Sequence, residues 1–134
     1  MKKMLIASII FFTLFYFLLN FILSQFFPDM QISKYSNLQE VKTDTAIQRG
    51  FIPAILPASA SKIIESHDLD TNTIFGSFNY EEKDEETFMQ NLTDIHNVDL
   101  MLEWGNFLFK VDKELNLVKF RNKPGSNSIN KQTP

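Results

Sequence analysis

The sequence predicts an α+β protein: one N-terminal transmembrane helix, then a small domain of about three antiparallel strands packed with two or three short helices. Two observations predict this class. The stretch Met4–Phe27 has no charged residue, no proline and no glycine. Beyond it, apolar residues recur at helical spacing in some segments and alternate with polar residues in others. The predicted organisation is a transmembrane signal anchor (1–27), a linker (28–35), a small α+β extracytoplasmic domain (36–121) and a disordered tail (122–134).

The N-terminal segment has the length and composition of a membrane span. As a helix, residues 4–27 extend roughly 36 Å against a hydrocarbon core of about 30 Å. Only a helix satisfies its own backbone groups in lipid. Lys2 and Lys3 precede the segment and no basic residue follows it directly. The predicted protein is therefore single-pass in the cell membrane, with the N-terminus cytoplasmic and the domain outside, in the periplasm if the cell is Gram-negative.

A cleaved secretory signal is the alternative for this segment. Signal peptides also begin with basic residues and continue with an apolar run, but that run usually has about 7–15 residues. The present run is longer, and Ile22-Leu23-Ser24 is a poor cleavage site. The domain is exported under either interpretation.

Charge and cysteine content exclude several classes of function. Lys2 and Lys3 are the only charges before Asp29, so the part from Pro28 onward has 11 of the 13 basic residues and all 16 acidic ones, a net charge of −5. Binding nucleic acid requires a basic surface, so no nucleic-acid partner is predicted. The chain has no cysteine, which excludes disulfides, thiolate metal sites and attachment of a lipid to cysteine.

The first half of the domain suggests two helices around a proline-rich segment. Ser36 and Gln39 form a capping-box pattern, which predicts a helix over residues 37–43. Pro53 and Pro57 exclude a helix through the apolar stretch 48–57, so an extended segment over the core is predicted there. Residues 58–67 are predicted to form a second helix.

The second half of the domain suggests strands and one further helix. Residues 73–80 are β-prone, and an apolar stripe predicts a helix from Asp84 to about His96. Residues 98–106 are ambiguous. Alternation over 107–111 and 115–121, joined by a polar turn, predicts a β-hairpin.

Residues 68–72 resemble the start of a calcium loop because Asp68, Asp70 and Asn72 alternate as oxygen ligands. An EF-hand also needs glycine at its sixth position and glutamate at its twelfth, where this chain has Thr73 and Asn79. The predicted role is a turn whose side chains bond local amides, and these three residues are only weak metal candidates. No metal site and no cofactor is predicted.

Catalytic motifs do not emerge from the sequence. His67 and His96 have no metal-ligand spacing, and each lies near the end of a predicted helix. No serine sits between glycines as in a nucleophile elbow, and the four glycines are too scattered for a phosphate loop. The protein is therefore predicted not to be an enzyme.

The proline-rich segment is the predicted binding surface. Its candidate residues are Arg49, Phe51, Ile52, Pro53, Leu56 and Pro57. Two roles are open for Arg49: bonding loop carbonyls to fix the segment, or pairing with a carboxylate on a partner or ligand.

Several spaced motifs resemble a family of small uncharacterised bacterial envelope proteins. They are Arg49-Gly50-Phe51-Ile52-Pro53, then Leu56-Pro57-Ala58-Ser59-Ala60, then Asp68-Leu69-Asp70-Thr71-Asn72. Family members carry Arg-Gly-Trp-Ile/Leu-Pro, Leu-Pro-x-Ser-Ala and Asp-Leu-Asp-Thr-Asn, and many look like lipoproteins. The resemblance covers about Tyr35 to Phe78. Two departures are Phe51 in place of tryptophan and a transmembrane helix in place of a lipid. The resemblance implies location and fold, and supplies no catalytic residue.

Three functions are consistent with these observations. The first is a membrane-anchored, non-enzymatic binding or accessory module of the cell envelope, whose partners are the lipid bilayer through residues 4–27 and another envelope protein. The second is a sensor for a small ligand or cation that uses the 68–72 turn. The third is an immunity-like inhibitor of an exported toxin, suggested by small size and acidity.

Overall fold

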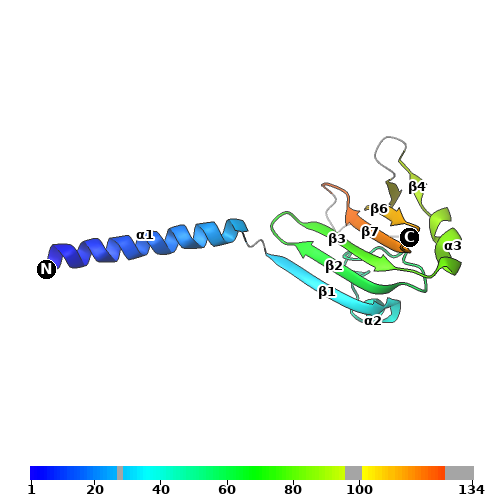
Figure 1. Cartoon of the computed structure of the whole chain (residues 1–134), viewed down its shortest axis with the longest axis horizontal. Coiled ribbons are helices and arrows are strands. Elements are labelled where there is room, and N and C mark those ends of the chain that lie inside the picture. Colours follow the sequence, from blue (N-terminus) through cyan, green and yellow to red (C-terminus); the bar gives the residue numbers. More distant parts are fainter. Residues whose placement is uncertain (27–28, 96–100, 126–134) are drawn as a thin grey trace.

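The N-terminal helix α1 (Lys2–Phe26) stands apart from the domain in the computed structural model, which describes residues 1–26, 29–95 and 101–125 (Figure 1). Every residue of α1 is exposed. It is the one helix of the described residues that is long and apolar enough to cross a membrane, and its position near the N-terminus fits a signal anchor or a signal sequence.

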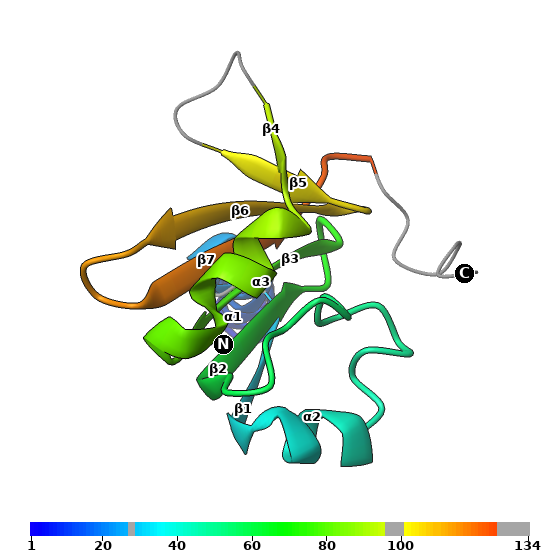
Figure 2. The ribbon, with the colours of Figure 1, turned by 90° about the vertical axis from the view of Figure 1, so that its right-hand side faces the viewer.

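The domain that follows α1 is built on a single antiparallel sheet. Its order is β1-β2-β3-β7-β6-β5-β4, seven strands in the described residues. The bounds are β1 (Met30–Asn37), β2 (Ser61–Asp68), β3 (Thr73–Asn79), β4 (Thr93–Asp94), β5 (Leu102–Trp104), β6 (Phe107–Asp112) and β7 (Leu117–Asn122). Figure 2 shows the sheet curving around the helical segment that precedes β4.

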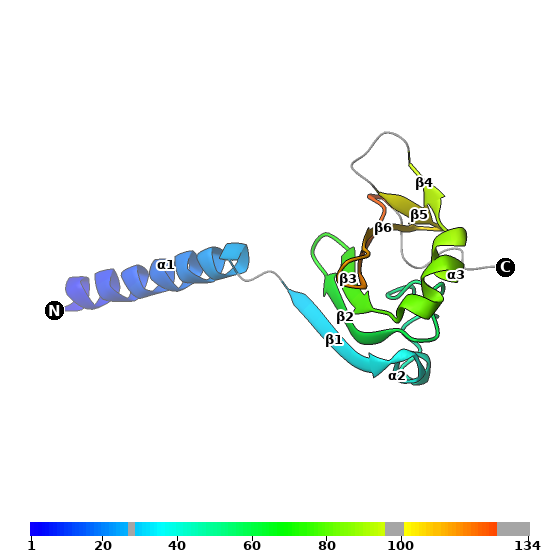
Figure 3. The ribbon, with the colours of Figure 1, turned by 45° about the vertical axis from the view of Figure 1, so that its right-hand side comes forward.

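The core lies between one face of this sheet and three covering segments. These are α2 (Leu38–Thr43), residues 44–60, and a 3₁₀ turn η1 (Glu82–Asp84) that leads into α3 (Glu85–Gln90). Figure 3 shows α2 and α3 on the side of the sheet remote from α1. We call this the covered face and the opposite one the outer face.

Aromatic rings fill the middle of the covered face. The Phe88 ring of α3 stands edge-on to Phe78 and to Phe109, with centroids 5.7 and 6.0 Å apart. Gly76 is required between the strands, because a Cβ there would lie 2.1 Å from the Ile64 carbonyl oxygen and 2.6 Å from a Phe120 ring carbon.

The structure corrects three sequence-based expectations about the first half of the domain. Residues 30–35, expected to be linker, belong to β1. Residues 61–67, expected to be helical, belong to β2, which pairs with β1 on one side and β3 on the other. The expected count of about three strands is too low. Tertiary pairing overrides the local helix propensity of this segment, because β2 as a strand gains hydrogen bonds along both edges and buries Ile63.

The expected long helix over 84–96 is also wrong. α3 ends at Gln90, β4 occupies 93–94, and residues 96–100 lie outside the described residues. Asp84 is the N-cap residue of α3 as expected, but its carboxylate accepts the Ser59 amide at 3.0 Å rather than an amide of the helix.

Other expectations are confirmed. The 37–43 helix is α2, although its cap is one residue later than predicted: Asn37 accepts the Glu40 amide, and Glu40 accepts the Ser36 amide. The 73–80 strand is β3, and the 107–121 hairpin is β6 and β7. The proline-rich segment lies over the core as predicted, but it forms turns and bends and is not extended. Of the predicted tail, Asn122 is a buried residue of β7, and residues 126–134 lie outside the described residues.

Candidate functional site

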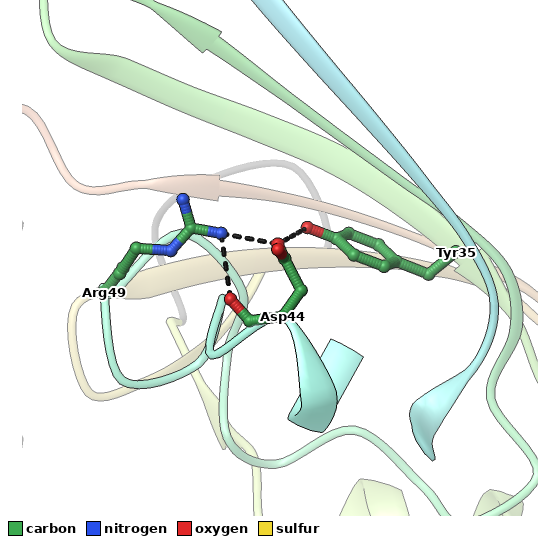
Figure 4. Close-up of polar contacts among 3 residues, drawn as sticks. All are labelled: Tyr35, Asp44 and Arg49. Carbon is green, nitrogen blue, oxygen red and sulfur yellow. Dashed lines mark hydrogen bonds and ion pairs between the residues drawn. The ribbon is translucent and has the colours of Figure 1, made fainter. Parts of the chain in front are cut away.

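The best-defined polar arrangement in the described residues centres on Asp44, which follows α2. Its carboxylate accepts the Tyr35 hydroxyl of β1 at 2.6 Å (Figure 4). The same oxygen accepts the Arg49 guanidinium at 2.5 Å, and Arg49 also donates to the Asp44 carbonyl oxygen at 3.2 Å. One charged side chain thus joins a strand, the end of a helix and a loop.

The loop continues from this ion pair into a stack of side chains. The Arg49 guanidinium lies over the Phe51 ring, with its central carbon 4.8 Å from the ring centroid. Phe51 in turn contacts the His67 ring of β2, with centroids 4.9 Å apart. His67 Nε2 shares a hydrogen bond with Asn72 Oδ1 at 2.9 Å. We call Tyr35, Asp44, Arg49, Phe51, Glu65 and His67 the Arg49 cluster.

Glu65 is the buried charge of this cluster. It stands on the covered face of β2, opposite Ser33 of β1 and Gly76 of β3, and is only 2% exposed. Burial raises the pKa of its carboxyl, while a hydrogen bond with Ser33 and the charges of His67 and Arg49 oppose that rise. One carboxyl oxygen, Oε1, has no hydrogen-bond partner in the described part of the chain, and neither does Nδ1 of His67.

The same surroundings shift the pKa of Tyr35. Burial raises the pKa of its hydroxyl, and the bond to Asp44 and the nearby Glu65 raise it further. The hydroxyl therefore stays protonated and donates. The phenol, the guanidinium and the ring stack tie the loop to β1 and β2, and leave Arg49 and Phe51 partly exposed.

The structure divides the six predicted binding residues into two groups. Ile52, Pro53, Leu56 and Pro57 are buried and pack as part of the core. Arg49 retains 45% of its side chain exposed, and Phe51 is half-buried. Arg49 takes the first of its two roles, since it bonds the loop of its own chain, while its exposed edge leaves the binding prediction open.

The 68–72 turn satisfies its own polar groups. Asp68 Oδ1 accepts the amides of Asp70 and Thr71 at 2.9 and 3.2 Å, and these bonds together with the Thr71 hydroxyl lower the pKa of the Asp68 carboxyl. The side-chain oxygen of Asn72 shares its hydrogen bond with His67. Within residues 1–26, 29–95 and 101–125, no three His, Cys, Asp or Glu side chains are grouped so as to hold a metal ion.

Sequence reasoning missed Asp44, Tyr35 and Glu65. A strand interpretation of residues 61–68 would have found Glu65, because alternation then places Ile63, Glu65 and His67 on one face. Asp44 and Tyr35 had no sequence signal, since their contact depends on how α2 packs against β1. His96 lies outside the described residues.

Comparison with known proteins identifies one domain. Residues 29–79 match the YbbD head domain, a domain family of unknown function. The match runs from β1 through α2 and the loop to β3, less than half of the 134-residue chain, and it contains the whole Arg49 cluster. No curated protein and no solved structure matches the chain. The match supports an uncharacterised family, and the motif pattern and the lipoprotein character of relatives stay predictions.

Proposed function

We propose that this protein is a membrane-anchored, non-enzymatic binding module of the cell envelope, which recognises another envelope protein through Arg49 and Phe51. Residues 4–27 hold it in the bilayer, with the domain outside the cytoplasm. The observation that supports the binding role most is the Arg49–Phe51 stack, exposed at its outer edge and fixed from beneath by Asp44, Tyr35 and His67.

Arginine and large aromatic residues dominate the binding energy of protein interfaces. A pair held rigidly before binding loses little conformational freedom when the partner arrives. Arg49 donates to Asp44 through one guanidinium nitrogen, Nη2, which bonds both the carboxylate and the backbone carbonyl oxygen. The remaining guanidinium donors suit a carboxylate or carbonyl oxygen of the partner.

Site-specific photocrosslinking in intact cells tests this proposal. The crosslinker replaces Phe51 in one variant and Ala54, an exposed residue of the same loop, in the matched control. Position 51 is expected to capture one defined envelope protein, and position 54 much less of it. Arg49→Gln, which keeps a long polar side chain without the charge, should weaken capture at 51. Capture that is diffuse, or equal at both positions, would contradict the binding role.

The anchor has its own test. The full-length chain should stay with the membrane after extraction at alkaline pH, and its size should be unchanged. A shortened chain that appears in the soluble exported fraction would show that the N-terminal segment is a cleaved signal.

The sensor and inhibitor alternatives lack a comparable observation. The 68–72 turn uses Asp68 and Asn72 for internal bonds, and no surface feature distinguishes a toxin-binding role from other protein binding.

A further inference from the structure

The outer face of the sheet presents a second surface, distinct from the Arg49 cluster. Directly opposite residues of an antiparallel sheet share a face. Two rows of outward residues therefore cross the sheet: Ile32, Ser66, Phe75, Arg121 and Leu108 in one row, and Lys34, Ile64, Ser77, Lys119 and Lys110 in the other.

The two rows contain basic residues and no acidic one, although the domain as a whole is acidic. The four basic residues are Lys34, Lys110, Lys119 and Arg121, all exposed. None of them forms an ion pair within residues 1–26, 29–95 and 101–125. Three carboxylates border the rows on the same face: Glu103 of β5 pairs with Lys123 at 2.9 Å, Asp112 accepts the Leu115 amide, and Asp68 accepts the amides of Asp70 and Thr71.

Two of these charges oppose each other directly. Lys110 of β6 and Lys119 of β7 are register partners, a position at which like charges destabilise a sheet. An anion above the pair would relieve their repulsion. Lys110, Lys119 and Arg121 also border a shallow hollow whose apolar lining comes from Phe75, Met101, Leu108 and Phe120.

Apolar side chains are exposed between the charges. Ile32 is 61% exposed, Phe75 42% and Ile64 38%. A surface that mixes lysine, arginine and exposed apolar side chains suits the boundary of an anionic bilayer, where the headgroups meet the charges and the apolar groups enter the acyl region.

The chain also places this face close to a bilayer. Only residues 27–29 separate the end of α1 from the start of β1, a length of at most about 14 Å between Phe26 and Met30. The covering helices α2 and α3 lie on the side of the sheet remote from α1, so the outer face is turned toward the α1 side (Figure 3).

We infer that the outer face docks on the anionic lipid headgroups of the membrane that α1 spans. This inference rests on the anchor of the proposed function, but not on the Arg49–Phe51 interaction. Lys34, Lys110, Lys119 and Arg121 bind the phosphates, while Ile32, Ile64 and Phe75 lie at the acyl boundary. Docking leaves the covered face, with the Arg49 cluster, directed away from the membrane.

Lipid is favoured over an acidic protein because the lipid is already present at high local concentration. A tether of three residues makes docking intramolecular, so a weak attraction is sufficient. A separate acidic partner would have to enter between the domain and the bilayer.

Single-cysteine labelling tests this inference well because the chain has no cysteine of its own. The full-length chain carries Ile64→Cys on the outer face or, as control, Ala54→Cys on the loop of the other side. Each variant is labelled with an environment-sensitive fluorophore and reconstituted into vesicles of phosphatidylcholine, with or without phosphatidylglycerol. The label at 64 is expected to shift to the blue and be quenched by a lipid-borne quencher only with phosphatidylglycerol; the label at 54 should change in neither.

Matched charge variants identify the cause. Gln substitution of Lys110, Lys119 and Arg121 should lower the ratio of docked to free domain on the order of a hundredfold, since each basic residue near an anionic surface contributes about fivefold. Gln substitution of Lys42, Lys83 and Lys113 changes the net charge equally but lies off the outer face, and should leave docking unchanged. High salt should release the domain.

The outcomes separate this inference from the proposed function. A chain that washes off the vesicles contradicts the anchor. A chain that stays embedded while the labels at 64 and 54 behave alike contradicts docking and leaves the anchor intact. A blue shift of the label at 64 that occurs without phosphatidylglycerol also overturns docking and indicates a protein contact or self-association. The same conclusion follows if substitution of Lys110, Lys119 and Arg121 leaves the blue shift unchanged.

Discussion

Both faces of the sheet carry phenylalanine and charged residues, which are buried on the covered face and exposed on the outer face. On the covered face, Phe78, Phe109 and Phe120 are at most 3% exposed, and the buried carboxyl of Glu65 lies within the electrostatic influence of Arg49 and His67. On the outer face, Phe75 and Ile64 remain open, and four basic residues have no ion-pair partner in the described chain. Buried aromatic rings stabilise the fold, whereas exposed rings among unpaired charges remain available to a partner.

This difference separates stability from binding. The covered face is expected to be sensitive to any loss of volume, because its side chains are close-packed. The outer face should tolerate substitution with little change in folding, while its interactions change greatly. Substitutions that compare the two faces therefore show which role each one has.

The largest expected difference comes from removing one phenylalanine from each face. Phe109→Ala empties a site that is 0% exposed and contacts Phe88, and should lower the free energy of unfolding by about 3–5 kcal/mol. Phe75→Ala should lower it by less than about 1 kcal/mol. Denaturant unfolding of the full-length chain in zwitterionic micelles, followed by the fluorescence of Trp104, measures both. Equal losses would show that the outer face is packed against something as well.

The two faces also differ in how far the sequence could predict them. Along Phe107–Val111 every second residue is apolar and local pairing is short-range, so the hairpin and its inward side chains follow from the pattern. Residues 30–35 read Met-Gln-Ile-Ser-Lys-Tyr, a run too short and too polar to predict a strand, and the strand they form pairs with β2 along its length. The helical spacing of apolar residues over 58–67 predicted a helix where β2 forms.

The candidate site was predictable only in part, for the same reason. Arg49 and Phe51 are conspicuous beside a proline-rich segment, and they do reach the surface. Their supports, Asp44, Tyr35 and Glu65, lie on different elements, and only the tertiary arrangement brings them together. The outer face could not be predicted either, because its four basic residues come from three separate strands, β1, β6 and β7. The domain as a whole is acidic, so its net charge gave no indication of an anionic partner.

A second comparison concerns the buried carboxyl of the covered face. Because burial raises the pKa of Glu65, the folded protein binds this proton more readily than the unfolded chain does. The carboxyl therefore costs stability as pH rises from the ordinary glutamate pKa through the raised one. Glu65→Gln removes the charge, so it should raise the free energy of unfolding by about 1 kcal/mol at neutral pH and have little effect below the ordinary glutamate pKa.

Unfolding at several pH values measures this effect, with Glu86→Gln, which replaces an exposed carboxyl of α3, as the matched control variant. A Glu65→Gln variant that is less stable at neutral pH would show that Arg49 and His67 hold the carboxyl in its ionised form. The covered face would then depend on an ion pair rather than on packing alone.

The smallest expected change in stability comes from Lys110→Glu on the outer face. This substitution should raise stability and weaken docking. Lys110→Glu replaces two opposed lysines by an attractive pair with Lys119, and should stabilise the sheet by about 0.2–1 kcal/mol. The same substitution puts a negative charge where a lipid phosphate is expected, so the label at position 64 should lose its response to phosphatidylglycerol. Unfolding in zwitterionic micelles and fluorescence in vesicles measure the two effects on one variant. If stability rises while docking is retained, the opposed lysines do not bind lipid. If stability and docking both fall, Lys110 supports the fold, and the two faces differ less in their roles than their burial indicates.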